Sequence, residues 1–194
     1  MTVFPDDPKT LVSTDWLAAH LKDPDLRVLD ASWHMPDAGR DARAEYAAGH
    51  IPGARFFDID EISDLRSDLP HMAPPVEKFI SRMRAMGVGD GHQVVVYDTA
   101  GLFSAARVWW LFRLMGKTDV AVLDGGLPKW RAEGREIEDM PPMVRDRHIT
   151  VSRQAGLVFN RLLKSNTDLA IDFHTGTTGL DVAAFHIGEM RIPD

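Results

Sequence analysis

The chain has 194 residues, of which 44% are hydrophobic and 26% are charged, a balance typical of a folded globular protein. A formal net charge of −7 without a basic patch argues against a nucleic-acid-binding surface, although a pocket for a small anion is compatible with it. No cysteine is present, which excludes disulfides, thiolate metal ligands and a cysteine nucleophile within these residues. The apolar runs are shorter than a membrane span and no secretory signal is visible, so we expect a cytoplasmic protein that does not bind membranes.

The first half of the chain alternates helical and extended patterns. Ser13 or Thr14 can cap the first helix, and Gly49 can close the second, because glycine readily adopts the left-handed conformation common after helices. The predicted segments are a helix over residues 13–21, a strand over 26–31, a helix over 41–48 and a strand over 54–59.

The alternation continues after a polar, proline-containing segment at residues 60–75. The predicted segments are a helix over 76–86, a strand over 92–97, a helix over 104–115, a strand over 119–123 and a helix over 127–132. Strands that alternate with helices indicate right-handed crossovers. The predicted fold class is therefore α/β, an open parallel sheet with helices on both faces. A polar linker at 139–147 predicts a domain over residues 1–147 and a short, incomplete segment over 148–194.

The loop that follows the strand at residues 92–97 is a candidate binding site. Open parallel sheets bind ligands beyond the carboxyl ends of their strands, where backbone N–H groups at helix starts favour negative charge. Asp98 begins this loop, and Ser104 is placed to cap the next helix. Because the carboxylate of Asp98 can itself occupy the concavity, we expect a structural aspartate that satisfies the loop amides.

Several motifs resemble, in order, those of rhodanese-type sulfurtransferases. Tyr46, followed after three residues by HIPGARF at 50–56, reproduces the pattern around HIPGA in that family. The other similar segments are LDASWHMP at 29–36, VVVYDTAGLFSAARVWW at 94–110 and LDGGLPKW at 123–130. Residues from about 10 to 156 thus resemble the N-terminal domain of a two-domain sulfurtransferase.

The resemblance implies two similarly folded domains, with the catalytic cysteine in the C-terminal one. That cysteine lies in a loop equivalent to residues 98–103 here, so Asp98 occupies its place in a non-catalytic domain that covers the active site. We therefore expect a truncated sulfurtransferase that is inactive alone. Its parent family uses a small anionic sulfur donor, its partner would be a cysteine-bearing rhodanese domain, and no cofactor is implied.

Within the family, residues 58–74 resemble 3-mercaptopyruvate sulfurtransferases more than thiosulfate sulfurtransferases, largely through His71 and Met72. In the former group, an Asp and a His at the positions of Asp60 and His71 are proposed to join a Ser of the second domain in proton transfer. An imidazole oriented by a carboxylate suits that task. The two side chains should then lie within hydrogen-bond reach near the Asp98 loop. The alternative is an exposed loop His and a turn Asp, and the sequence leaves both open.

Three further residues are candidates for roles at this site. The resemblance suggests Trp33 as an aromatic wall at the site mouth, although a lone Trp is more often part of a core. Arg107, on the helix after the loop, could bind a substrate carboxylate, but an intradomain salt bridge is the favoured alternative. His50 is expected to bond to the backbone in a turn.

The tail departs from the rhodanese pattern. Residues 172–175 (DFHT) and the loop after them resemble the zinc-dependent succinylglutamate desuccinylase and aspartoacylase group, in which His174 would be a zinc ligand. A zinc site needs three protein ligands, and the upstream H-x-x-E pair of that group is missing, so we expect no metal site. The alternatives to a truncated sulfurtransferase are a non-catalytic rhodanese-like binding module and, remotely, a fragment of a zinc-dependent deacylase.

Overall fold

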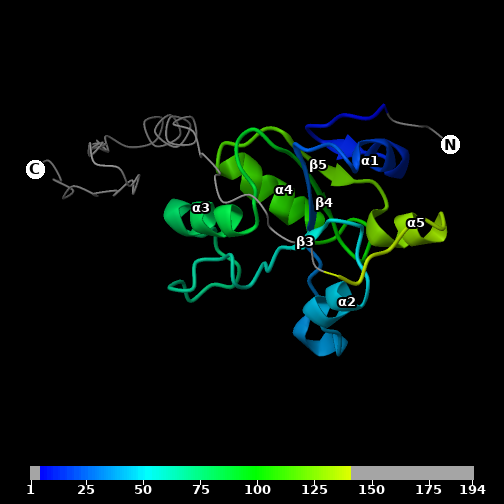
Figure 1. Ribbon diagram of the computed structural model, residues 1–194. Coiled ribbons are helices and arrows are strands. Elements are labelled where there is room, and N and C mark those ends of the chain that lie inside the picture. Colours follow the sequence, from blue (N-terminus) through cyan, green and yellow to red (C-terminus); the bar gives the residue numbers. More distant parts are fainter. Residues whose placement is uncertain (1–4, 141–194) are drawn as a thin grey trace, which may run out of the picture. The chain divides into compact units, whose positions relative to one another are not determined.

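The computed structural model describes residues 5–140, and a five-stranded sheet forms the centre of this part (Figure 1). The strands lie in the order β1-β5-β4-β2-β3, and every neighbouring pair is parallel. The sequence prediction of an open parallel sheet is confirmed. The strands are β1 (Leu11–Val12), β2 (Leu26–Asp30), β3 (Arg55–Phe56), β4 (Gln93–Tyr97) and β5 (Val120–Leu123).

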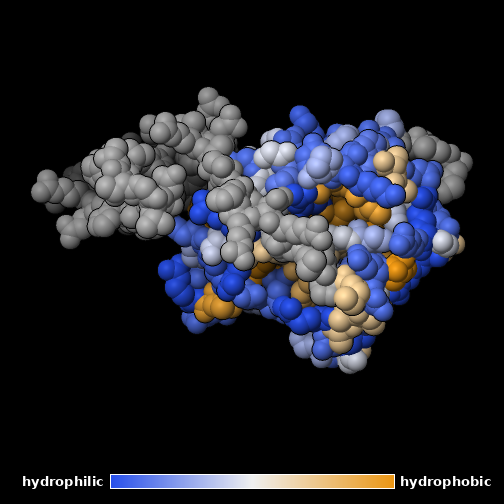
Figure 2. All heavy atoms as spheres, in the orientation of Figure 1, coloured by the Kyte–Doolittle hydropathy of each residue, from blue (hydrophilic) through white to orange (hydrophobic). Residues whose placement is uncertain are grey.

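Helices cover both faces of the sheet, as predicted. Figure 1 shows α3 and α4 on one side of the strands and α1 and α5 on the other. The face drawn in Figure 2 is largely hydrophilic where it is coloured, with apolar side chains exposed in places. The helices are α1 (Thr14–His20), α2 (Ala42–Ala48), α3 (Val76–Ala85), α4 (Ala105–Leu114) and α5 (Gly126–Ala132), with a short 3₁₀ helix, η1, at Pro36–Ala38.

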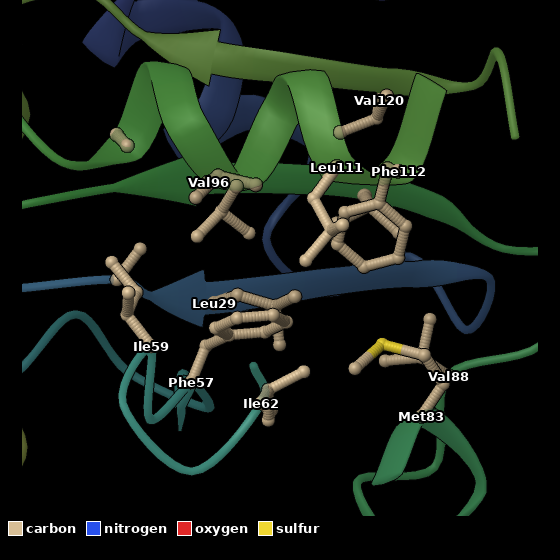
Figure 3. Close-up of a cluster of buried hydrophobic side chains, with 14 of the residues drawn as sticks. Leu29, Phe57, Ile59, Ile62, Met83, Val88, Val96, Leu111, Phe112 and Val120 are labelled. Atoms are coloured by element: carbon tan, nitrogen blue, oxygen red, sulfur yellow. The ribbon is translucent and has the colours of Figure 1, made fainter. Parts of the chain in front are cut away.

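Two apolar clusters hold the layers together, one on each face of the sheet. In β4, Val96 belongs to the cluster under α3 and α4, whereas Val95 and Tyr97 belong to the cluster under α1 and α5. Figure 3 shows the first cluster, in which Phe112 of α4 lies above Leu29 of β2. A strand buried on both faces explains the unbroken apolar run of β4.

Two local predictions need correction. The strand predicted over 54–59 is confined to β3, because Asp58 starts a turn: its side chain accepts the N–H of Glu61 at 3.0 Å and its carbonyl that of Ile62 at 2.8 Å. Gly49 does follow α2, but with φ of 167° it is extended and not left-handed. A Cβ atom there would lie 2.8 Å from the side chain of Ile137, so glycine is required for space.

Candidate functional site

The loop after β4 is closed by the carboxylate of Asp98. Its Oδ1 accepts the backbone N–H groups of Ala100 at 3.0 Å and Gly101 at 2.7 Å. Its Oδ2 accepts those of Phe103 at 2.7 Å and Ala105 at 2.9 Å. Only 1% of Asp98 is exposed. The expectation of a structural aspartate that satisfies the loop amides is confirmed, and the concavity that would attract an anion is already filled.

Asp98 also caps α4, a task that the sequence analysis assigned to Ser104. That prediction was wrong, because the Ser104 side chain makes no capping hydrogen bond. The N–H of Ala105 instead donates to Asp98, seven residues upstream. The Asp98 side chain, at the end of β4, therefore does what an N-cap residue usually does. The local sequence pattern could not predict this, because the acceptor lies seven residues before the helix.

Asp60 and His71 meet beside this loop. The Nε2 atom of His71 lies 2.7 Å from Oδ1 of Asp60, and the indole N–H of Trp33 donates to the same oxygen at 3.0 Å. Trp33 follows β2, and its ring stacks with that of Phe103 in the Asp98 loop, with 6.4 Å between centroids. The predicted proximity of Asp60 and His71, close to the carboxyl ends of the strands, is confirmed.

Trp33 contributes to both the core and this site. Its ring packs against the edge of the cluster under α3 and α4 and meets the His71 imidazole edge-on, with 5.0 Å between centroids. Trp33 therefore packs against the core and also contacts His71 and Asp60, and its role as the border of a substrate site stays a prediction. Phe103 was missed by the sequence analysis; it is 57% exposed beside Trp33, and its signal was an aromatic residue within a loop at the carboxyl end of a strand.

Arg107 lies in the first turn of α4 and donates from its guanidinium to the backbone carbonyl of His71. Within residues 5–140, this bond takes the place of the intradomain salt bridge that the sequence favoured. Burial lowers the pKa of Arg107 below the usual arginine value, because a half-buried guanidinium loses hydration.

His50 has the structural role expected for it. It is fully buried, its Nδ1 lies 2.8 Å from the carbonyl oxygen of Tyr46, and its ring stacks on that tyrosine with 4.1 Å between centroids. The backbone of His50 also pairs with that of Glu138, which secures the chain after α5.

The sequence analysis missed a link between the loops after β2 and β4. The N–H of Ser32 donates to Asp30 Oδ1 at 2.9 Å, and the Ser32 hydroxyl oxygen accepts the N–H of Thr99 at 3.0 Å. Asp30 is fully buried, and burial raises the pKa of its carboxyl group. An acidic residue at a strand end, with Ser two residues later, was the available signal.

A cavity of about 420 Å³ opens next to Trp33 and Asp60. Arg43 and Asp58 line it as an ion pair, with 2.8 Å between the guanidinium and the carboxylate. Arg40, also in the lining, pairs with Glu45 at 2.7 Å. Both arginines that line the cavity are thus already paired with carboxylates, so the cavity has no evident preference for anions. Because Asp60 also lines it, the cavity extends the Asp60 site.

The described part of the chain holds no candidate metal cluster and no helix that could span a membrane. Across residues 5–140, no cluster of three or more His, Asp or Glu side chains is placed to hold a metal ion. His174 and the tail resemblance lie outside the described residues. The helices within that range are also too short or too polar to cross a membrane.

The sheet and its strand-end loop define an open parallel α/β domain, and sequence comparison gives its family. Residues 13–133 match the family described as "Rhodanese-like domain", and the chain therefore belongs to that family.

Curated relatives extend the comparison to particular enzymes. The chain is 56% identical over 128 residues to "Thiosulfate/3-mercaptopyruvate sulfurtransferase 1, mitochondrial" of Arabidopsis thaliana. The aligned region covers 66% of this chain and 34% of the relative. It is 49% identical to the 3-mercaptopyruvate sulfurtransferase of Homo sapiens, over 63% of this chain and 43% of that enzyme. The chain thus spans less than half of the length of either relative.

The fold also matches a solved structure. SseA from Escherichia coli, described as a 3-mercaptopyruvate sulfotransferase with the rhodanese fold, superposes with a TM-score of 0.68 at 40% identity. The match covers 73% of this chain and 55% of that one. The sequence resemblance to rhodanese-type sulfurtransferases is thereby confirmed.

Proposed function

We propose that this chain supplies the non-catalytic domain of a 3-mercaptopyruvate or thiosulfate sulfurtransferase. The observation that carries the proposal is the Asp60–His71 pair, which lies beside a strand-end loop already filled by Asp98. Residues 1–194 contain no cysteine, so the sulfur-accepting thiolate must come from outside them, from a cysteine-bearing rhodanese domain. On this proposal the chain alone is inactive.

In this scheme the partner thiolate takes sulfur from a small anionic donor and becomes a persulfide. When 3-mercaptopyruvate is the donor, cleavage of its C–S bond leaves an enolate that must gain a proton to become pyruvate. The imidazole of His71, oriented by Asp60, would move that proton together with a Ser of the partner domain. The indole N–H of Trp33 would keep the Asp60 carboxylate in place.

Trp33 and Arg107 are proposed to bind the donor. The Trp33 ring would border the site, as its contacts with His71 and Phe103 suggest. Arg107 has five N–H donors, and within residues 5–140 one of them donates to the His71 carbonyl. Its other donors could bind the carboxylate of a donor such as 3-mercaptopyruvate, because a guanidinium matches the geometry of a carboxylate.

The second candidate function is a rhodanese-like binding module without turnover. The filled Asp98 loop favours it, because that loop offers neither a nucleophile nor an open anion site. A zinc-dependent deacylase is the remote third candidate, and metal analysis of the purified chain tests it. The sequence favours a cytoplasmic location, whereas one relative is named as mitochondrial, so cell fractionation is needed to decide.

A reconstitution assay tests the proposed function. The full chain alone should transfer no sulfur from thiosulfate or 3-mercaptopyruvate to cyanide above a heat-denatured sample. Addition of a separately purified cysteine-bearing rhodanese domain should raise the transfer rate above that of the added domain alone. Replacement of His71 by Ala should remove the gain. No gain with any donor would reject the sulfurtransferase role and favour the binding module.

A further inference from the structure

His71 has an unusual main-chain conformation. Its φ angle of 56° makes it the one non-glycine residue with positive φ among residues 5–140. L-residues rarely adopt this left-handed region, and they remain there only when surrounding contacts enforce it. The segment between β3 and α3 holds His71 without the support of a helix or strand. Contacts around His71 must therefore stabilise this conformation.

Two hydrogen bonds fix the main chain at this point. The guanidinium of Arg107 donates to the carbonyl oxygen of His71, and the N–H of Asp64 donates to that of Met72 at 2.9 Å. The second bond lies within the same segment. The first bond connects two parts of the domain, because Arg107 belongs to helix α4 and His71 to the segment between β3 and α3.

The anchor itself is rigid. Arg107 precedes Val108 in α4, and both Val108 and Leu111 of this helix are 1% exposed in the core. A guanidinium held on such a helix can fix the position of a carbonyl group some distance away along the chain. Its planar fork, with several donors on a long stem, suits this reach better than the single ammonium of a lysine.

We infer that Arg107 is a positioning residue whose bond to the His71 carbonyl holds the left-handed turn that directs the imidazole to Asp60. The inference deepens the proposed function and rests on it, since the Asp60–His71 pair is the proposed proton relay. Breaking the bond should let the main chain at His71 relax. The imidazole would then leave Asp60 Oδ1, and Trp33, which donates to the same oxygen, would sense the change.

NMR of the full chain tests this inference directly. The readouts are the imidazole signals of His71, assigned with His71→Asn, and the indole N–H of Trp33, assigned with Trp33→Phe. Arg107→Gln, whose side chain is too short to reach the carbonyl, should shift or broaden both sets of signals. Arg107→Lys, which keeps a donor on a long stem, should leave them closer to wild type.

The same helix provides a matched control. Arg113 of α4 also donates to a backbone carbonyl, that of Lys9 at 2.7 Å, and its guanidinium lies over the ring of Trp109. Arg113→Gln removes an equivalent bond away from the Asp60 site and should leave the His71 and Trp33 signals unchanged. Circular dichroism confirms that each compared variant is folded.

Two results would overturn the inference: unchanged His71 and Trp33 signals in Arg107→Gln, or equally large shifts in Arg107→Lys, Arg107→Gln and Arg113→Gln. If Arg107→Gln does not fold, Arg107→Met decides, because it also lacks a donor. Signals displaced in a folded Arg107→Met but not in Arg113→Gln support the role, and signals identical to wild type reject it. Neither readout involves sulfur transfer. Failure of the reconstitution assay would therefore reject the proposed function, whereas the NMR signals separately decide whether Arg107 positions His71.

Discussion

The imidazole of His71 and the carboxylate of Asp60 lie 2.7 Å apart although 11 positions separate them in the sequence. The same carboxylate oxygen accepts the indole N–H of Trp33, which comes from the loop after β2. One oxygen atom thus joins two aromatic side chains from different segments. A substitution at Asp60 should therefore alter the environment of both rings.

Replacement of Asp60 by Ala should release Trp33 and His71 together. We expect the indole N–H resonance of Trp33 and the imidazole resonances of His71 to move in the variant, as measured by NMR. The stability cost should stay below about 1 kcal/mol, because the Asp60 side chain is 66% exposed. Asp68→Ala, at an exposed position of the same segment, is the control and should leave the two ring signals in place. Independent movement of the two rings would contradict a shared acceptor.

Replacement of Asp98 by Ala should destabilise the domain strongly. Four backbone N–H groups would lose a charged, buried acceptor, for which we expect a cost of about 2–4 kcal/mol in urea unfolding. Asp124→Ala is the matched control, because Asp124 also follows a strand but is exposed and paired with Lys129. It should cost less than about 1 kcal/mol. Similar losses for the two variants would refute the capping role of Asp98.

Replacement of Asp98 by Cys should not create a sulfur carrier. A side chain at this position points into its own loop and is almost fully buried, so a thiolate there would not meet a sulfur donor. We expect no cyanide-releasable sulfur after incubation with thiosulfate or 3-mercaptopyruvate, with a cysteine-bearing rhodanese enzyme as the positive control. Detection of such sulfur on the variant would mean that the loop opens in solution.

Replacement of Asp30 by Asn should flatten the pH dependence of stability. Burial raises the pKa of Asp30 in the folded state above its ordinary value of 3.8. Its stabilising contribution is therefore complete below pH 3.8 and is lost as the pH rises through the raised folded-state pKa. The stability of Asp30→Asn relative to wild type should accordingly improve with rising pH in urea titrations.

Asp37→Asn, at an exposed position in η1, provides the control for this titration. Its stability relative to wild type should change less over the same pH range. If the difference in unfolding free energy between Asp30→Asn and wild type is constant with pH, burial does not raise the pKa of Asp30.

Exposed apolar side chains in the Asp98 loop should promote self-association. Leu102 and Phe103 are 62% and 57% exposed, and apolar groups exposed together favour contacts between molecules. The double variant Leu102→Ser with Phe103→Ser should sediment with a lower weight-average mass than wild type at high concentration. Ile137→Ser is the control and should behave as wild type. An unchanged mass in the double variant would exclude this loop from the contact.

Local patterns were sufficient to predict most of the fold. The apolar run of β4 and the helical spacing of apolar residues in α4 indicate directly that these elements are buried. β1 left no such record, because a two-residue strand is defined by its pairing with β5 and not by its own pattern. Gly49 and Ser104 misled for a related reason, since contacts distant in sequence determine what each residue does.

The role of Asp98 was predictable from its position after a strand, whereas the Asp60–His71 pair was predictable only through a family pattern. The spacing of Asp60 and His71 alone does not require contact, and the resemblance supplied the reason to expect one. The bond from Arg107 to a backbone carbonyl could not be predicted, because the acceptor has no side-chain identity in the sequence. Ser32 was overlooked because its partners, Asp30 and Thr99, lie on different strand ends.

The two border strands of the sheet, β1 and β3, have two residues each. A border strand of that length leaves few unpaired backbone groups for another chain to join, and natural sheets use such brevity to resist fibrillar growth. Copies of this domain should therefore not extend one another's sheets into continuous cross-β stacks. Contacts between molecules through this part of the chain should instead give limited, finite assemblies held by side chains.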